Sequence, residues 1–427
     1  MNRIDFPELD EVLYCEKLEN GLTVLVLPRK GFSKRLAYFM TDYGSVHTRF
    51  SLDGTEYTAP AGVAHYLEHK LFDMPGGRDV STEFAQLGAM TNAFTSYDMT
   101  AYYFSCTDNF DACLKLLLEF VSTPWFTEES VAKEQGIIGQ EIGMNADNPD
   151  TRIFENLMQA MYENHPIREP ILGTQESIAQ IDKQVLYESH RAFYRPSNML
   201  LCVVGDVDPK EVTRIAEQIL PPEEAAPVQR QDRWDEKMEV STPYVECDME
   251  VAMPMFQLGF KCEPLAKGEE AVRLEFVGDL AAEALFGESS ALYLKLYEEG
   301  IIDSSFGGGF ETVDGMAMLT CAGDSEDPEA VREALLEQAK HLAAQGIPET
   351  DFARMKRSAM GRRIRELDSF DSTCFRLCAY HLSGYDYFNF PGIYETITAE
   401  DVCAFLERIV TRERCCLSEI NPLTQED

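Results

Sequence analysis

The sequence predicts an α+β fold built from two domains, and three observations support this prediction. A chain of 427 residues is long enough for two domains of about 200 residues, each with its own core. Each half opens with strand-like runs and continues with longer helical patterns. Between the halves, the sequence holds Pro, Glu, Gln and Arg with little apolar periodicity, which is typical of a linker. We therefore expect an N-terminal domain at 1–220, a linker at 221–240 and a C-terminal domain at 241–427.

The composition is typical of a soluble globular protein with an acidic surface. The chain has 37 Lys and Arg against 74 Asp and Glu, and its formal charge of −37 should repel nucleic acid and anionic membranes. Residues 1–22 lack the apolar run of a secretory signal, and no stretch of about 18 apolar residues follows. The 12 cysteines include no C-x-x-C pair and are expected to be free thiols. We expect a cytoplasmic protein without nucleic acid partners and without membrane insertion.

Two strand-like runs precede the segment that carries the chemistry. Residues 22–27 follow the turn signal Asn20-Gly21, and residues 36–39 begin a second run that leads to Gly44. We expect these two strands to pair with each other.

The next segment, residues 61–72, reads A-G-V-A-H-Y-L-E-H-K-L-F. His65 and His69 are four residues apart and Glu68 lies three beyond His65, so all three share one face of a helix. Two neutral imidazoles on adjacent turns can bind one zinc ion, and a carboxylate beside them can accept a proton from water on the metal. H-x-x-E-H is the inverted form of the zinc protease signature H-E-x-x-H. The alternative is two surface or core histidines that fall together by chance.

The same segment shows how its helix would be anchored. Val63, Leu67 and Leu71 form an apolar stripe opposite the histidines. Pro60 suits the first turn of a helix, and the run from Met74 to Gly77 does not readily continue one. Farther on, residues 91–96 and 100–106 are β-prone and are expected to form a hairpin beside this helix.

A later helix is expected to supply the third metal ligand. Thr127 is a suitable N-cap, and the helical pattern runs to about residue 144. Glu134 and Glu141 are seven apart and therefore share a face, and we favour Glu141 as the ligand. The alternative is a solvated acidic face. Gly136 and Gly139 each cost about 1 kcal/mol relative to Ala inside a helix, so we expect another backbone to approach there.

The remaining elements complete two domains. Residues 199–204 form a buried strand, and a helix at 209–219 should close the first domain. The second half repeats the order strand, strand, helix without an H-x-x-E-H motif. Its expected strands are 244–250, 255–260 and a strand-like region within 307–320, and its expected helices are 269–286, 290–299, 328–344, 350–367 and 399–408.

The first half resembles the inverted-zincin peptidase family that includes pitrilysin, insulinase and the mitochondrial processing peptidase. The matching features are H-Y-L-E-H from His65, E-Q-G-I-I-G-Q-E-I from Glu134, N-A-F-T-S from Asn92, Gly173, and Y-R-P-S-N-M-L-L-C-V-V-G-D from Tyr194. The second half resembles the metal-free repeat of this family, chiefly through S-S-A-L-Y-L-K-L-Y-E-E-G. The whole chain is similar to a bacterial two-domain, half-ring subunit of the processing-peptidase type.

The resemblance implies two related domains, each an antiparallel-rich sheet with packed helices, that face a chamber. It implies a zinc metalloendopeptidase in which His65, His69 and Glu141 bind zinc and Glu68 is the general base. Glu134 would support the ligands from behind. The edge strand Asn92, Ala93, Phe94 and Thr95 would pair with the substrate backbone, although ordinary hairpin pairing alone would also account for this strand.

One segment departs from the family pattern. Active members of the family usually supply an arginine and a tyrosine from the metal-free repeat, in a segment resembling S-R-L that is followed downstream by G-L-A-Y. This chain reads Ser290-Ala291-Leu292 and, downstream, G-I-I-D from Gly300. The arginine is missing, and in the family this arginine together with the tyrosine contacts the substrate carbonyl region. The expected function is therefore a zinc endopeptidase for peptides or small unfolded proteins that needs a second homologous subunit, in a heterodimer or a homodimer. The alternative is a non-catalytic peptide-binding or scaffolding subunit of a processing complex.

Overall fold

The computed structural model describes residues 1–220, 222, 228–231, 233–265, 267–313 and 315–423. The fold is α+β, and packing divides the chain into two compact units. Unit 1 contains Met1–Ile142, Pro170–Arg233 and Ile364–Asn389, and unit 2 contains Gly143–Glu169, Trp234–Arg363 and Phe390–Asp427. Each unit therefore includes a short segment from the other half of the sequence. The linear division around 221–240 stays a prediction, and positions 221, 223–227 and 232 of the expected linker lie outside the described residues.

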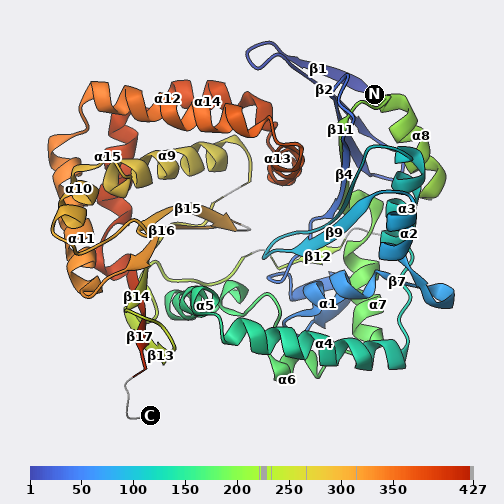
Figure 1. The fold of residues 1–427 in the computed structure, drawn as a ribbon, viewed down its shortest axis with the longest axis horizontal. Coiled ribbons are helices and arrows are strands. Elements are labelled where there is room, and N and C mark those ends of the chain that lie inside the picture. Colours follow the sequence, from blue (N-terminus) through green and yellow to red (C-terminus); the bar gives the residue numbers. More distant parts are fainter. Residues whose placement is uncertain (221, 223–227, 232, 266, 314, 424–427) are drawn as a thin grey trace. The chain divides into compact units, whose positions relative to one another are not determined.

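Unit 1 is organised around a seven-stranded sheet in the order β1-β2-β3-β11-β4-β10-β9 (Figure 1). The strands of unit 1 are β1 (Asn2–Phe6), β2 (Glu11–Lys17), β3 (Thr23–Pro28), β4 (Arg35–Thr41), β5 (Arg49–Leu52), β6 (Thr55–Thr58), β7 (Asp73–Met74), β8 (Arg78–Asp79), β9 (Met90–Thr95), β10 (Thr100–Cys106), β11 (Met199–Gly205) and β12 (Gln229–Arg230). The helices that begin in unit 1 are α1 (Val63–Lys70), α2 (Val80–Gln86), α3 (Phe110–Ser122), α4 (Glu128–Ala146), α6 (Gln175–Ile178), α7 (Lys183–Phe193), α8 (Pro209–Ile219) and α13 (Phe370–Leu382).

The strands expected to pair before the motif, β3 and β4, lie on either side of β11. β11 runs parallel to β3 and antiparallel to β4, and all of its residues are buried. The expected pairing of β3 with β4 is therefore wrong. A continuous apolar strand such as β11 needs cover on both faces and therefore a central position in the sheet. The expected hairpin of β9 and β10 is confirmed, with β9 at the sheet edge.

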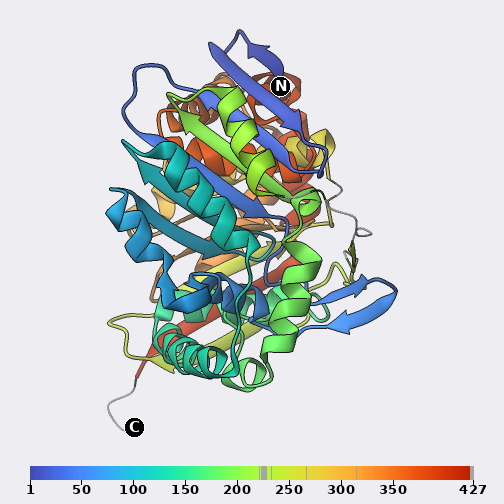
Figure 2. The ribbon, with the colours of Figure 1, turned by 90° about the vertical axis from the view of Figure 1, so that its right-hand side faces the viewer.

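The two faces of this sheet are covered by helices from different parts of the sequence. On one face, α1, α2, α3 and α8 contact the strands, and Leu201 and Val203 of β11 join the core there. Cys202 lies between them and, because side chains alternate along a strand, points to the other face. There the Cys374 thiol on α13 donates to the backbone oxygen of Cys202 at 3.8 Å. Figure 1 shows α13 beside β4 and β11, and Figure 2 shows the β5–β6 hairpin extending away from the seven-stranded sheet.

Unit 2 has a five-stranded sheet in the order β13-β17-β14-β16-β15. Its strands are β13 (Tyr244–Met249), β14 (Met255–Lys261), β15 (Gly307–Val313), β16 (Met316–Asp324) and β17 (Cys415–Pro422). The helices that begin in unit 2 are α5 (Pro149–Met161), α9 (Glu269–Phe286), α10 (Ala291–Glu298), α11 (Pro328–Gln345), α12 (Glu349–Glu366), α14 (Phe390–Thr396) and α15 (Ala399–Ile409).

Helix α5 comes from the first half of the sequence but packs on β13, β14 and β17 in unit 2. Gly259 of β14 makes this close approach possible, because a Cβ there would lie 2.5 Å from the Met161 sulfur. The hydroxyl of Ser418 on β17 also donates to the backbone oxygen of Ile153 at 3.0 Å. α5 therefore belongs to the core of unit 2.

Two expectations from composition concern the whole chain. All 12 cysteines are free, as expected. In the part of the chain that the structure describes, no helix combines the length and the apolar character that crossing a membrane requires.

Candidate metal centre

The helix that carries the H-x-x-E-H motif, α1, forms as expected, with its apolar stripe in the core. Val63, Leu67 and Leu71 are at most 2% exposed. The helix begins later than expected, since its N-cap is Gly62 and Pro60 lies before it. Gly62 has φ 94, and a Cβ there would lie 2.4 Å from the backbone oxygen of Leu172. Only glycine combines this left-handed conformation with so close a contact, so the start of α1 is fixed against the segment before α6.

The two histidines lie together on the polar side of α1. Their ring centroids are 4.6 Å apart, as the four-residue spacing on a helix predicts. The side chain of His65 is 8% exposed and that of His69 is 26% exposed. The pair is therefore partly shielded from water and still open on one side.

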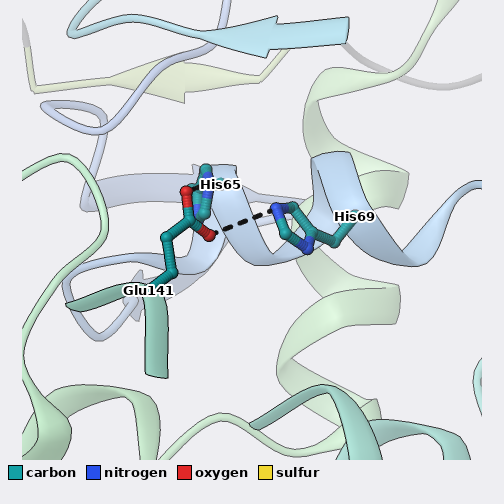
Figure 3. A group of neighbouring side chains, drawn as sticks. All are labelled: His65, His69 and Glu141. Atoms are coloured by element: carbon teal, nitrogen blue, oxygen red, sulfur yellow. Dashed lines mark ion pairs between the residues drawn. The ribbon is translucent and has the colours of Figure 1, made fainter. Parts of the chain in front are cut away.

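Glu141 reaches the histidines from α4 (Figure 3). One of its carboxylate oxygens lies 3.7 Å from Nε2 of His65, and the other lies 3.6 Å from Nε2 of His69. One ligand atom from each of the three residues lies within 4.8 Å of the other two. The structure thus brings together three residues that the sequence separates by 72 positions between His69 and Glu141.

Contacts elsewhere along the two helices fix α4 against α1. The Tyr66 hydroxyl on α1 donates to the backbone oxygen of Val131 on α4 at 2.5 Å. Thr127 caps α4 as expected, with its hydroxyl accepting from the Ser130 amide at 3.0 Å. Ile138 is fully buried. These contacts fix the separation of α1 and α4, across which the Glu141 side chain reaches the histidines.

The expectation that another backbone approaches α4 at its glycines is wrong. A Cβ at Gly136 would meet no atom of the described residues within 4 Å outside the helix itself. At Gly139 it would meet the side chain of Gln175, whose amide donates to the Gly139 backbone oxygen at 2.6 Å. At Gly139 the Gln175 side chain occupies the space where we expected a backbone. The low helix propensity of glycine does not indicate whether a side chain or a backbone lies against it.

His65 is electrostatically suited to bind a metal. Burial is the main cause that lowers the pKa of His65 to about 3, and the nearby His69 is the second cause. The imidazole is therefore neutral at physiological pH. Among the described residues, its buried Nδ1 has no hydrogen-bond partner. A neutral imidazole is the form that binds a metal.

His69 has a different environment because Glu134 stands behind it. The Nδ1 atom of His69 lies 3.0 Å from a carboxylate oxygen of Glu134. Burial opposes the charged form of His69, but the hydrogen bond to Glu134 and the surrounding carboxylates together raise its pKa. A hydrogen bond at Nδ1 leaves Nε2 to face Glu141.

Glu68, the expected base, is held by a threonine of the edge strand. The Thr95 hydroxyl donates to a Glu68 carboxylate oxygen at 2.7 Å. Burial raises the pKa of the Glu68 carboxyl, and the Thr95 hydrogen bond acts in the opposite direction. Glu68 is thus a shielded carboxylate with one oxygen already occupied.

The residues of the edge strand do not share one role. Thr95 and Ala93 lie on the side of α1, because alternate residues of β9 face the same way. Phe94 faces the other side, where its ring lies 6.0 Å from that of Phe375 on α13. The Asn92 side-chain oxygen accepts from the Ala93 amide at 2.9 Å. The backbone edge of β9 pairs only with β10 in the described structure, so its other edge lacks a strand partner.

The donor set fits a zinc ion. Two imidazoles and one carboxylate from two helices are a common zinc-binding combination that leaves a fourth position open. The Nδ1 of His65 has no hydrogen-bond partner among the described residues, and the Nδ1 of His69 is engaged by Glu134, so both histidines can act as ligands through Nε2.

The sequence reasoning missed two contacts at this site. We expected Thr95 to touch substrate, and it contacts Glu68. We assigned no role to Lys70, whose ammonium group lies 3.8 Å from the second oxygen of Glu134. A lysine directly after the second histidine, where a core-facing helix would favour an apolar residue, was the available signal.

Comparisons with known proteins identify the family of this chain. The model described as Insulinase (Peptidase family M16) matches residues 54–175, and the Peptidase M16 inactive domain matches residues 180–359. YmfH of Bacillus subtilis (strain 168), named an uncharacterized zinc protease, is 39% identical over 428 residues, covering 98% of this chain and 99% of YmfH. This chain belongs to the M16 peptidase family. The family resemblance inferred from the motifs is thereby confirmed.

Solved structures agree with this M16 assignment. An M16-like peptidase from Alicyclobacillus acidocaldarius has a TM-score of 0.92 and 31% identity, with 98% of this chain and 100% of that chain covered. A protease from Helicobacter pylori has a TM-score of 0.83 with 96% and 99% covered, and at 18% identity this likeness concerns the fold alone. The M16 fold therefore extends over both units of this chain.

Proposed function

We propose that this M16 chain is a zinc-dependent endopeptidase that cleaves peptides or small unfolded proteins. The observation that carries the proposal is the convergence of His65, His69 and Glu141, with ligand atoms within 4.8 Å of one another. Glu68 lies on the same helix turn as His69, where a general base is needed. The zinc protease name of YmfH supports the same chemistry.

The reaction would divide between the metal and Glu68. When bound, zinc makes a water more acidic and polarises a carbonyl oxygen. Glu68 would take the proton from the attacking water and return it to the leaving amine. Thr95 would hold one Glu68 oxygen in place, and Glu134 would hold the His69 ring. The unpaired edge of β9 would receive the substrate backbone as an added strand.

We also propose that a second homologous subunit completes the site. In the segment that lacks the family arginine and tyrosine, Leu292 and Ile302 are buried at 5% and 3% exposure. Ala291 and Asp303, at the places of the missing arginine and tyrosine, are exposed. The segment thus keeps its packing residues and lacks its substrate-contacting ones. This observation also favours the second candidate, a peptide-binding or scaffolding subunit without activity of its own.

Metal analysis separates these candidates at the first step. We expect the purified chain to hold about one zinc per chain by elemental analysis. A chain that binds no zinc, at concentrations where zinc proteases are saturated, would leave only the scaffolding function.

Peptide cleavage decides the second step. Removing one prearranged donor from such a site costs about 100- to 1000-fold in rate, so the zinc-loaded chain alone should be nearly idle. A homologous subunit that lacks H-x-x-E-H but carries the arginine and tyrosine should restore the activity. Full activity of the chain alone would refute the need for a partner, and no activity with any such subunit would favour scaffolding.

A further inference from the structure

The last residue of α1, Lys70, has no exposed side-chain surface. Lysine is almost never fully buried unless its charge is paired. Its ammonium group lies 2.5 Å from an Asp73 oxygen and 3.8 Å from a Glu134 oxygen. Asp73 is 55% exposed, so the only strongly shielded partner of the two is Glu134, at 14%.

The Glu134 carboxylate connects Lys70 to the metal centre. Its Oε1 lies 3.0 Å from Nδ1 of His69, and its Oε2 lies 3.8 Å from Nζ of Lys70. The two oxygens thus contact neighbouring residues of one helix. A carboxylate attached at both oxygens has less freedom to rotate away from the imidazole than one attached at a single oxygen.

We propose that Lys70 is a positioning residue for the metal centre, acting through Glu134 on His69. The inference rests on the proposed zinc site. The ammonium group attracts Oε2 and so keeps Oε1 as the acceptor for the Nδ1 hydrogen of His69. With that hydrogen on Nδ1, the lone pair of Nε2 remains on the side of Glu141, where the metal would bind.

The charge of Lys70 has a second effect on the same group of residues. Glu134, Glu141 and Glu68 place three carboxylates around His69. A buried positive charge next to Glu134 reduces the repulsion among them and holds Glu134 in the geometry that its hydrogen bond to His69 needs.

A purely structural role is the competing explanation, because Lys70 also joins the end of α1 to Asp73. The two roles predict different behaviour of matched variants. Asp73→Asn weakens the structural contact and leaves Glu134 untouched, whereas Lys70→Met removes both contacts with a side chain of similar length. Glu134→Gln removes the charge that Lys70 is proposed to act through.

The experiment measures zinc affinity by competition with a chromogenic chelator, which requires no activity. Loss of such a supporting partner typically weakens metal binding by about 10- to 100-fold. We expect that loss for Lys70→Met and for Glu134→Gln, and an affinity within about twofold of wild type for Asp73→Asn. The double variant Lys70→Met/Glu134→Gln should bind zinc as Glu134→Gln does, because both changes interrupt one connection.

Three results would overturn the inference: wild-type zinc affinity in Lys70→Met, losses that multiply in the double variant, or an Asp73→Asn variant as weak as Lys70→Met. A wild-type chain that binds no zinc would instead overturn the proposed function. If Lys70→Met does not fold, the slowly exchanging ammonium signal of Lys70 in an NMR spectrum replaces it. That signal should shift on zinc binding in wild type and not in Glu134→Gln, and an equal shift in both would refute the connection.

Discussion

The sheets of the two units have the same strand order, although among the described residues the candidate metal centre lies in unit 1 alone. In unit 1 the order is β3-β11-β4-β10-β9, with two further strands at one edge, and in unit 2 it is β13-β17-β14-β16-β15. Among these five strands in each unit, the last along the chain, β11 or β17, lies between the first two. It runs parallel to the first and antiparallel to the second. The two halves are therefore versions of one topology.

The correspondence extends to the helices that the halves exchange. α5 is the third helix after β10 and packs on the sheet of unit 2. α13 is the third helix after β16 and packs on the sheet of unit 1. Each half therefore provides, at the same place in its sequence, a helix that covers the sheet of the other half.

The difference between the units lies in the helix pair at the site. In unit 2, α9 and α12 hold the places of α1 and α4 in the element order. There Arg363 of α12 lies 3.1 Å from Glu275 and 2.7 Å from Asp279, which are four residues apart on α9. Its guanidinium carbon also lies 4.0 Å from the ring centre of Phe276.

The comparison shows two ways to fill one place in the fold. Unit 2 pairs two carboxylates of one helix with a cation from the other helix of the pair, so a side chain of the same chain supplies the positive charge between them. Unit 1 sets two imidazoles against a carboxylate, and three carboxylates gather around His69. Unit 1 also has an internal cation, Lys70 behind Glu134, and we infer that an external cation would bind on the other side, between the two histidines and Glu141.

The largest expected effect concerns the base of unit 1. Glu68→Gln keeps the size of the side chain and removes the proton acceptor, so hydrolysis by the assembled enzyme should fall about 100- to 10,000-fold while zinc content stays at wild type. His69→Ala should lose both the bound zinc and the hydrolytic activity. Elemental analysis together with peptide cleavage distinguishes the two variants. A Glu68→Gln enzyme that still hydrolyses peptides normally would remove Glu68 from its proposed role.

The second prediction tests the internal cation of unit 2. Arg363→Met leaves Glu275 and Asp279 without it, and breaking such a buried pair costs about 3–5 kcal/mol in the free energy of unfolding. Zinc content should not change. Denaturant unfolding is the measurement, and the triple variant with Glu275→Gln and Asp279→Asn is the control that should recover most of the loss. A single variant as stable as wild type would mean that the salt bridge contributes little.

The third prediction compares α7 with α15, the helices that precede the last strand of each half. In α7, burial lowers the pKa of His190 to about 4, and the hydrogen bond to the Val121 backbone oxygen raises it by a smaller amount. In the unfolded chain the pKa of His190 is about 6.5. The contribution of neutral His190 to the free energy of unfolding is therefore fully present above pH 6.5, and about 3 kcal/mol of it is lost as the pH falls to 4. The middle of α15 has buried Leu406 instead.

His190→Leu should therefore remove about 3 kcal/mol of pH dependence between pH 7 and pH 4. Denaturant unfolding at both pH values gives the difference between variant and wild type. An unchanged pH dependence would show that His190 titrates normally in the folded protein.

The smallest expected effect concerns Thr95, for which the sequence suggested substrate contact. Thr95→Val removes the hydroxyl that donates to Glu68, and a hydrogen bond to a charged group is worth about 1.5–3 kcal/mol. We expect kcat to fall about tenfold with KM unchanged, and Thr95→Ser to restore it. A rise in KM with normal kcat would return Thr95 to substrate binding.

The local elements of unit 1 could be predicted because their patterns are local. The four-residue spacing of the histidines, the apolar stripe of α1 and the Thr127 cap all depend on neighbours within one or two turns. These patterns placed His65, Glu68 and His69 on one helix face. Selecting Glu141 as the third ligand required only its spacing from Glu134 and the family resemblance, and the geometry is consistent with that choice.

The tertiary structure decided what depends on which surfaces meet. No local pattern indicated that β11 would separate β3 from β4, or that α5 and α13 would pack on the sheet of the other half. The same is true of Lys70, whose burial depends on Glu134, 64 residues later in the sequence (134 − 70). Helices and strands follow from short-range periodicity, whereas the partner of a buried charge or of a central strand is set by the free energy of contacts between distant segments.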